Sequence, residues 1–261
     1  GGLGFLGLLA ARHPALPVVY LSDAGCAPYG KLPRRALAAR LDSLLRALAA
    51  EHGVTHAVLA CNAASTVLGD LAAPREGVAV AGIIAPALAE LARRPSERLG
   101  VIGGRRTVRS DVYGRALRSA GHDVRQRVAQ PLSAHVEAGR LETEEVRRDV
   151  AAILAPLRGV EVLVMACTHY PALAPLFAEH CPGAELYDPA AAALAEVERE
   201  WPLASPSSVA PAHRFLTTGD REAMRRAGRM AFGMELREIE RFVVSPDRGG
   251  SPSNRGQSSE D

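Results

Sequence analysis

The sequence predicts an α/β protein with two pseudo-symmetric lobes, each built on a mostly parallel sheet flanked by helices. Short apolar runs alternate with longer amphipathic stretches, which is typical of parallel strands covered by helices on both faces. The chain also contains an internal repeat, because GVTHAVLACN (53–62) is similar to GVEVLVMACT (159–168) and each segment follows a predicted helix. Two related lobes would face each other, and we expect the active site in the cleft between them.

The predicted elements follow in chain order. Strands are expected at 16–23, 55–61, 78–84, 97–104, 122–128, 160–167, 184–188 and 213–219. Helices are expected at 33–51, from 63 onward, and at 86–94, 109–121, 141–157 and 171–181. We assign 1–85 plus 190–244 to the first α/β lobe and 86–189 to the second. The tail 245–261 is rich in Ser, Gly, Pro and charged residues, so we expect it to be disordered.

Composition places the chain among ordinary globular proteins. Of its 261 residues, 48% are hydrophobic and 23% are charged, and the formal net charge is +2. This charge gives no basic stripe for nucleic acid, and no apolar run approaches the roughly 20 residues that span a bilayer. The 4 Cys residues form no CxxC pair, which favours a reducing cytoplasm over a disulfide framework. We therefore expect a cytoplasmic protein that binds neither nucleic acid nor membrane.

The repeated Cys residues indicate a chemistry. Cys61 and Cys167 each lie where a strand ends and a helix begins, the edge at which parallel α/β sheets bind ligands. Amide N–H groups at that position favour the thiolate, which can remove a proton from a carbon atom. A thiol on the opposite face of that carbon can return a proton. Two facing lobes would thus perform a two-base racemisation that needs no metal and no cofactor.

Other interpretations of the cysteines stay open. A strand Cys is commonly a buried structural residue, although equivalent positions in a repeat argue against this. A zinc site from Cys61, Cys167 and His169 would lack the usual ligand spacing. A hydrolase pair of Cys167 and His169 is disfavoured because a helix start disrupts their common strand face. Cys26 and Cys181 have no counterpart in the repeat, and we expect them to be inert.

Several segments carry a family resemblance. They are GGLGFLGLL at the N-terminus, SDAGCAPYG (22–30), ACNAAS (60–65), VIGGRRTVRSDVY (101–113), QPLSAHVEAGR (130–140), ACTHYP (166–171) and RFLTTGD (214–220). Their sequence and order resemble glutamate racemases, in the cofactor-independent aspartate/glutamate racemase superfamily. The combination of ACTHYP with PYG and ACN is specific, whereas any one of them alone is weak.

The resemblance implies roles for individual residues. Cys61 and Cys167 would be the paired acid/base residues, one for each enantiomer, and His169 would orient or assist Cys167. Tyr29 and Gly30 would hold a substrate carboxylate, largely through backbone N–H groups. The other residues implied to line the substrate site are Asn62, Ala63, Thr168 and His169.

Three further residues have weaker assignments. The resemblance makes Thr107 a carboxylate contact, but a helix N-cap is an equally good interpretation. It makes Glu137 a polarising partner of His169, but a solvated helix charge explains it as well. Asp23 is expected to cap or orient the loop that contains Tyr29.

The sequence departs from the family pattern at several points. The family's first strand and its Asp-Ser pair would lie just upstream of Gly1, so we expect an N-terminally truncated sequence. The family usually has Thr at the position of Ala63, and the missing hydroxyl would cost about 1 kcal/mol of substrate binding. A Thr is also common where Gly104 stands. The ACTHYP side of the site is intact.

The leading functional hypothesis is a cofactor-independent isomerase that interconverts L- and D-glutamate. It would supply D-glutamate for peptidoglycan synthesis, and so for cell wall biogenesis and cell shape. The alternatives are a racemase of aspartate or another small acid, and a non-catalytic relative that binds a ligand or a protein. The expected partner is the small-molecule substrate, with no metal, and the family resemblance also allows a homodimer.

Overall fold

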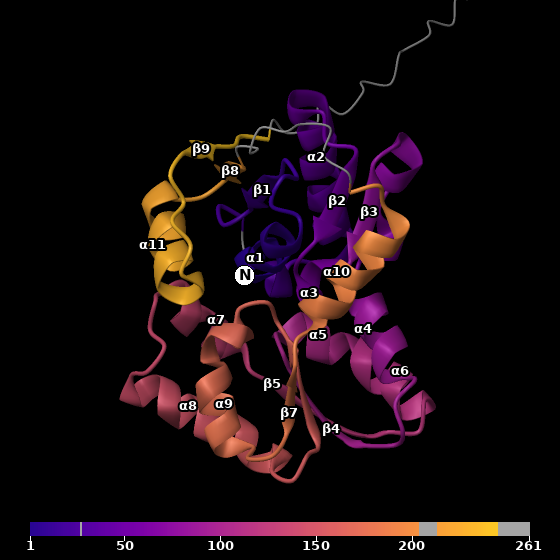
Figure 1. The fold of residues 1–261 in the computed structure, drawn as a ribbon, viewed down its shortest axis with the longest axis vertical. Helices are drawn as coiled ribbons and strands as arrows, with labels where there is room; N and C mark the ends of the chain where they lie inside the picture. The colour runs from indigo at the N-terminus through magenta and orange to yellow at the C-terminus, as the bar shows by residue number, and fades with distance from the viewer. Residues whose placement is uncertain (27, 204–212, 245–261) are drawn as a thin grey trace, which may run out of the picture.

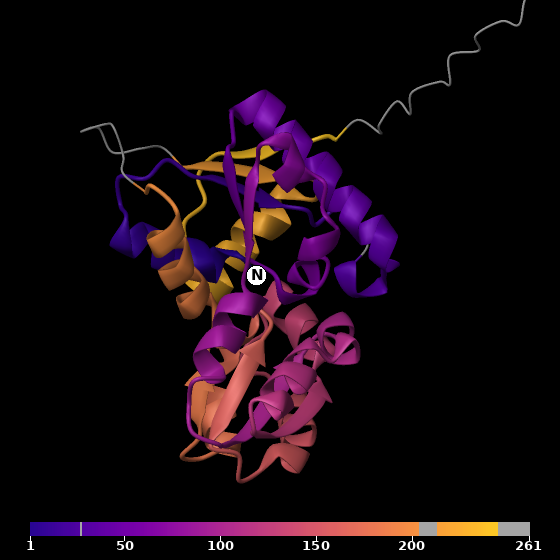
Figure 2. The same ribbon diagram turned by 90° about the vertical axis from the view of Figure 1, so that its right-hand side faces the viewer.

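The computed structural model describes residues 1–26, 28–203 and 213–244, which form two lobes stacked along the longest axis (Figure 1). The two ends of the described chain build the upper lobe, and the middle of the chain builds the lower lobe (Figure 2). All the strand pairs found in the described residues are parallel. The α/β class predicted from the sequence is confirmed. The tail 245–261, predicted to be disordered, lies outside the described residues.

The second lobe contains a four-stranded sheet in the order β5-β4-β6-β7. Its strands are β4 (Arg98–Gly103), β5 (Asp123–Val128), β6 (Val162–Ala166) and β7 (Glu185–Tyr187). The helices of this lobe are α4 (Ile84–Leu91), α5 (Arg105–Ser110), α6 (Val112–Ser119), α7 (Gln130–Glu137), α8 (Glu144–Leu154) and α9 (Ala174–His180). Helices α7, α8 and α9 bury one face of the sheet, and α4 and α6 bury the other. This double cover explains why β6 is apolar and buried along its whole length.

The first lobe contains two smaller sheets. Strands β1 (Val19–Ser22), β8 (Arg214–Thr217) and β9 (Ile239–Arg241) pair in the order β1-β8-β9, and β2 (His56–Leu59) pairs with β3 (Ala79–Gly82). Its helices are α1 (Leu3–Arg12), α2 (Arg34–His52), α3 (Asn62–Ser65), α10 (Pro189–Glu200) and α11 (Arg221–Phe232). Leucines on one side of α2 pack against both sheets. Within the described residues, β1 and β2 each keep one edge without a partner strand.

The repeat noticed in the sequence has the same backbone geometry in both lobes. Gly53 and Gly159 end the preceding helical segments with φ of 65° and 79°, a left-handed conformation that glycine adopts without strain. The strands β2 and β6 follow. The backbone N–H groups of Cys61 and Cys167 then each donate to the carbonyl two residues earlier, at 2.7 Å in both cases. The two cysteines therefore leave their sheets in equivalent ways.

Several predicted helices are interrupted. The helix expected at 109–121 breaks at Asp111, where φ is 52°, and becomes α5 and α6. The helix expected at 141–157 begins later, because the Thr143 side chain caps it by accepting from the amide of Val146. The remaining short turns are 3-10 helices at Tyr29–Lys31, Leu68–Asp70, Ala73–Glu76, Ala155–Leu157 and Tyr170–Leu173.

None of the helices in the described ranges is both long and apolar enough to cross a membrane.

Candidate active site

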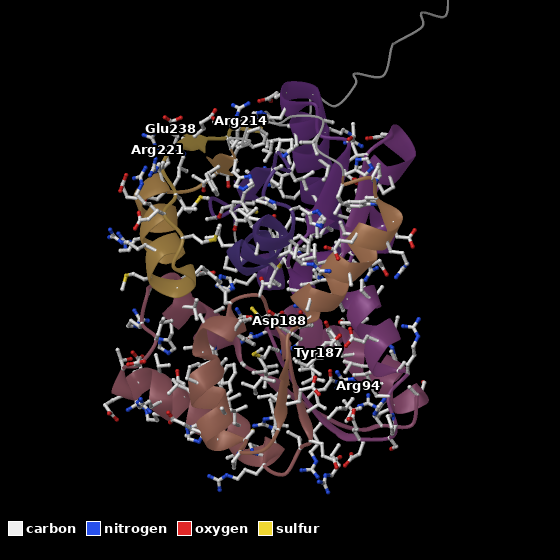
Figure 3. The ribbon with its side chains drawn as sticks, in the orientation of Figure 1. Arg94, Tyr187, Asp188, Arg214, Arg221 and Glu238 are labelled. Atoms are coloured by element: carbon white, nitrogen blue, oxygen red, sulfur yellow. The ribbon has the colours of Figure 1, made fainter. Side chains whose placement is uncertain are left out.

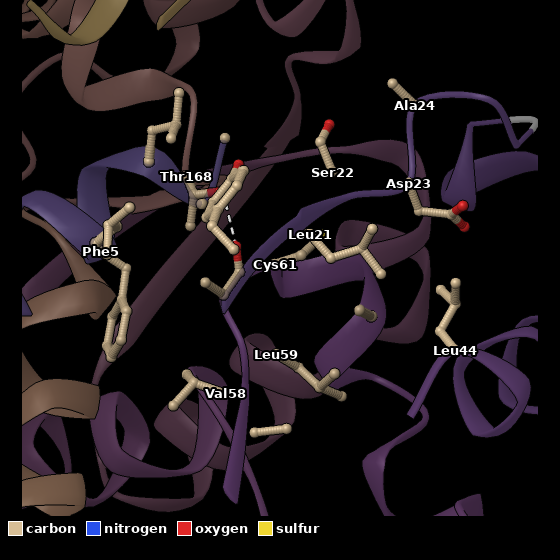
Figure 4. Close-up of a pocket in the computed structure, with 18 of the residues that line it drawn as sticks. Phe5, Leu21, Ser22, Asp23, Ala24, Leu44, Val58, Leu59, Cys61 and Thr168 are labelled. Carbon is tan, nitrogen blue, oxygen red and sulfur yellow. Dashed lines mark hydrogen bonds between the residues drawn. The ribbon is translucent and has the colours of Figure 1, made fainter. Parts of the chain in front are cut away.

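A cavity of about 1280 Å³ is lined by residues of both lobes, the larger share of them from the first lobe. The carboxyl ends of β2 and β6 open into it, and they bring Cys61 from the first lobe and Cys167 from the second lobe to the same space. Figure 4 shows Cys61 beside Thr168, which follows Cys167 in the second lobe. Every residue assigned to the site from the sequence lines this cavity: Tyr29, Gly30, Cys61, Asn62, Ala63, Thr107, Glu137, Cys167, Thr168 and His169.

Burial decides the protonation state of Cys167. The sequence suggested that amide groups would favour its thiolate, and the backbone N–H of His169 does act in that direction. Loss of contact with water is the larger effect, and it raises the pKa of the Cys167 thiol to about 12. A charge on Cys61 would raise it further. The amide therefore lowers the thiol pKa as expected, but burial outweighs it, and Cys167 is a thiol at neutral pH.

His169 links Cys167 to Glu137. Its Nδ1 lies 3.6 Å from the Cys167 sulfur, and its Nε2 lies 3.3 Å from Oε1 of Glu137. Burial lowers the pKa of His169 well below its usual value, so the imidazole is neutral at neutral pH. In the tautomer that carries its proton on Nε2, the ring presents the lone pair of Nδ1 to the thiol. Glu137 is 64% exposed, so it is a solvated helix charge as well as a partner of His169.

The loop of Tyr29 and Gly30 is fixed by Asp23. The Asp23 carboxylate accepts from the Tyr29 hydroxyl at 2.9 Å, from the Thr218 hydroxyl at 2.7 Å, and from Arg40 Nη2 at 2.6 Å. Burial raises the pKa of Tyr29, which keeps its hydroxyl a donor. The sequence expected Asp23 to orient this loop, and these hydrogen bonds confirm it. They leave the backbone of Tyr29 and Gly30 against the cavity.

Buried polar groups from both lobes surround the Cys61 side of the cavity. Thr168 donates its hydroxyl to the carbonyl of Ala60 at 3.2 Å, a bond between the two lobes. Thr107 is buried, and its hydroxyl has no hydrogen-bond partner among the described residues. Helix α5 begins after Gly104, so Thr107 is not its N-cap. An unpaired buried hydroxyl beside a cavity favours the other interpretation, a ligand contact.

The two remaining cysteines differ in position. Cys181 is buried in the core of the second lobe, whereas Cys26 lines the outer part of the cavity. All four cysteines are free thiols. Within the described part of the chain, no three His, Cys, Asp or Glu side chains are grouped in a way that could hold a metal ion. The zinc site considered from the sequence therefore finds no ligand cluster in this structure.

Two residues of the site had not been singled out from the sequence. Arg106 of α5 donates through Nε to the carbonyl of Tyr29 at 3.0 Å and through Nη2 to the carbonyl of Leu32, so it joins the second lobe to the loop of Tyr29 and Gly30. Tyr113 of α6 donates its hydroxyl to Oδ1 of Asn62 at 2.8 Å. Both partners lie far away in the sequence. A local pattern could not have revealed these contacts, although both residues belong to the segment VIGGRRTVRSDVY.

Comparison with known proteins places this fold and cavity in a family. The chain matches the Asp/Glu/Hydantoin racemase family over residues 7–197. It is 36% identical over 225 residues to the glutamate racemase of Gloeobacter violaceus, with 84% of each chain covered. The solved structure of glutamate racemase from Thermus thermophilus in complex with β-chloro-D-alanine superposes with a TM-score of 0.80 at 27% identity, over 93% of each chain. The structure of Francisella tularensis glutamate racemase in complex with D-glutamate shares the fold, with a TM-score of 0.82 at 21% identity over 93% of this chain and 94% of that one. The chain therefore belongs to the Asp/Glu/Hydantoin racemase family.

Proposed function

We propose that this protein is a glutamate racemase that uses Cys61 and Cys167 as its two acid/base residues. The observation that carries the proposal is the entry of two equivalent thiols into one cavity from opposite lobes. A racemase must remove the α-proton from one face of a planar intermediate and return a proton to the other face. Two thiols on opposite lobes meet this need without moving the substrate. The choice of glutamate follows the named activity of the Gloeobacter violaceus relative.

The high pKa of Cys167 determines how it acts in each direction. As a proton donor it is ready, because burial keeps it a thiol at neutral pH. As a base it must first lose its proton, and Nδ1 of His169 is the acceptor within reach. The thiolate then takes the α-proton, and the Cys61 thiol gives its own proton to the opposite face. At the end of these steps His169 holds the extra proton and Cys61 is the thiolate, and proton exchange with solvent restores both groups. In the reverse direction the Cys61 thiolate removes the α-proton, the Cys167 thiol returns one, and His169 gives its proton back to Cys167, so the proton count balances.

Polar groups of the cavity would hold the substrate carboxylates. Backbone N–H groups of the Tyr29–Gly30 loop, the Asn62 amide and the Thr107 hydroxyl come from three elements that contact one another, and all of these residues line the cavity. Such donors stabilise carboxylates and the negative charge that develops when the α-proton leaves. Ala63 also lines the cavity and contributes no donor.

The test is α-carbon chemistry in deuterated water with the full-length protein. Cys61→Ser and Cys167→Ser should each lower racemisation of glutamate by at least about 10²-fold, because each removes one acid/base group. Each variant should still exchange the α-proton of one enantiomer, and the two variants should exchange opposite enantiomers. Cys181→Ala, in the core of the second lobe, is the matched control and should racemise normally.

Three outcomes would overturn parts of this proposal. If both serine variants racemise like the parent, the two-thiol mechanism is wrong. If the parent racemises aspartate faster than glutamate, the substrate is wrong while the mechanism holds. If the parent binds an acidic amino acid without exchanging its α-proton, the protein is a binding module.

The cellular role follows from the product. D-glutamate made by this reaction would enter peptidoglycan synthesis. The reaction belongs in the cytoplasm, because both cysteines must stay reduced. A homodimer remains a prediction from the family resemblance, and gel filtration with light scattering would test it.

A further inference from the structure

Tyr113 reaches from the second lobe into the first to contact the residue after Cys61. It lies on α6, it is fully buried, and its hydroxyl donates to Oδ1 of Asn62 at 2.8 Å. Asn62 is the first residue of α3 and is itself buried. Burial raises the pKa of Tyr113 well above its usual value, so the hydroxyl keeps its proton and remains a donor.

This hydrogen bond fixes which end of the Asn62 amide faces Tyr113. With Oδ1 taken by the tyrosine, the amide can offer only its Nδ2 donors to other groups. Among the described residues Nδ2 has no hydrogen-bond partner, although it is buried and Asn62 lines the cavity. A buried donor without an acceptor is unfavourable, and a carboxylate oxygen in the cavity would satisfy it.

We infer that Tyr113 is a positioning residue, which holds the Asn62 amide so that Nδ2 donates to a carboxylate of the bound amino acid. The inference rests on the proposed function, since it concerns the substrate of that same cavity. Without the tyrosine hydroxyl the Asn62 amide can flip and place Oδ1 against the substrate carboxylate. Both oxygens are hydrogen-bond acceptors, so they repel each other. Tyr113 would therefore act on substrate binding and leave the proton transfers to the thiols.

Tyr113→Phe tests this with little change in packing. We expect KM for L- and D-glutamate to rise about ten- to a hundredfold, in line with the loss of one hydrogen bond to a charged group, while kcat changes by less than about twofold. Tyr187→Phe is the matched control, because Tyr187 is buried in the same cluster and is not among the described residues that line the cavity. Figure 3 labels Tyr187 beside Arg94, whose guanidinium lies 5.3 Å from the ring centre. The control should lose no affinity.

A double-mutant cycle separates positioning from a purely structural role. In an Asn62→Ala background Tyr113 has no amide to hold, so Tyr113→Phe should raise KM no further. Equal increases in KM in both backgrounds, or an unchanged KM for Tyr113→Phe alone, would overturn the inference while the parent enzyme still racemises glutamate. A parent that neither turns over nor binds glutamate, measured by calorimetry, would overturn the proposed function and this inference together. Thermal unfolding of each variant checks that it is folded.

Discussion

The carboxylate of Asp23 offers the most direct test of how the first lobe holds the loop of Tyr29 and Gly30. It accepts hydrogen bonds from Tyr29, Thr218 and two nitrogens of Arg40, and its side chain is only 5% exposed. The substitution Asp23→Asn keeps the shape of the side chain and removes its charge. An amide NH₂ would then face the guanidinium of Arg40, so at least one of the two hydrogen bonds from Arg40 is lost.

The expected cost follows from the burial of the pair. Breaking a fully buried ion pair by changing one partner costs about 3–5 kcal/mol, and Arg40 is 26% exposed, which places the loss near the lower end. We therefore expect Asp23→Asn to lower the free energy of unfolding by about 3 kcal/mol. For a chain of this size the melting temperature should fall by roughly 6–12 °C. KM for glutamate should rise as well, because the Tyr29 loop is no longer fixed.

Urea unfolding followed by circular dichroism measures this loss, with Glu76→Gln as the control. Glu76 makes an equally bidentate pair with Arg46, with N–O distances of 2.7 and 2.9 Å, but it is 42% exposed. Solvent screens a pair as exposed as this one, so the control should lose little stability and no affinity. Equal losses in the two variants would refute the reasoning that burial makes the Asp23 pair strong.

The remaining predictions concern protonation and backbone conformation. The alkylation rate of Cys167 by iodoacetamide should rise about tenfold per pH unit from about pH 7 to 10, since only the thiolate reacts and the thiol pKa is about 12. Peptide mass spectrometry measures this rate, and a plateau below pH 10 would contradict it. The thiol pKa of Cys167 is about 12 in the folded protein and about 9 in the unfolded chain, so the free energy of unfolding should keep its full value below pH 9 and fall as the pH rises towards 12. Urea unfolding at several pH values measures this fall. Gly53→Ala and Gly159→Ala should each cost about 1 kcal/mol of stability and leave KM unchanged, because both residues have positive φ and an added Cβ would touch nothing within 4 Å. A change in KM, or no loss of stability, would count against this account of the two repeats.

Much of the fold could be predicted because its signals are local. The apolar runs that became β2 and β6 end in the same Ala-Cys pair, and this placed both thiols at the carboxyl ends of parallel strands. Other elements gave weaker signals. Strand β9 was not predicted, since it is three residues long and only Ile239 in it is buried. The break at Asp111 was missed because one left-handed residue changes no hydrophobic periodicity.

The residues of the site could be named from the sequence, but their chemical state could not. The amides next to Cys167 were expected to favour its thiolate, and one of them does lower the thiol pKa, but burial by residues from distant segments outweighs this effect. The contact of Tyr113 with Asn62 joins residues 51 positions apart, so it exists only once the lobes are assembled. Long-range packing therefore determined both the protonation state of the thiol and the orientation of the amide.

The divided sheet of the first lobe leaves backbone groups that another segment could pair with. Consecutive residues of β1 and of β2 line the central cavity, where the free sides of these strands point N–H and C=O groups away from any described strand. Such groups must be hydrated or bonded to some other extended segment. The second lobe has no comparable interruption among its described strands, since β4 and β6 are flanked on both sides. An extended segment that paired with both β1 and β2 would satisfy these groups and join the two small sheets of the first lobe into one.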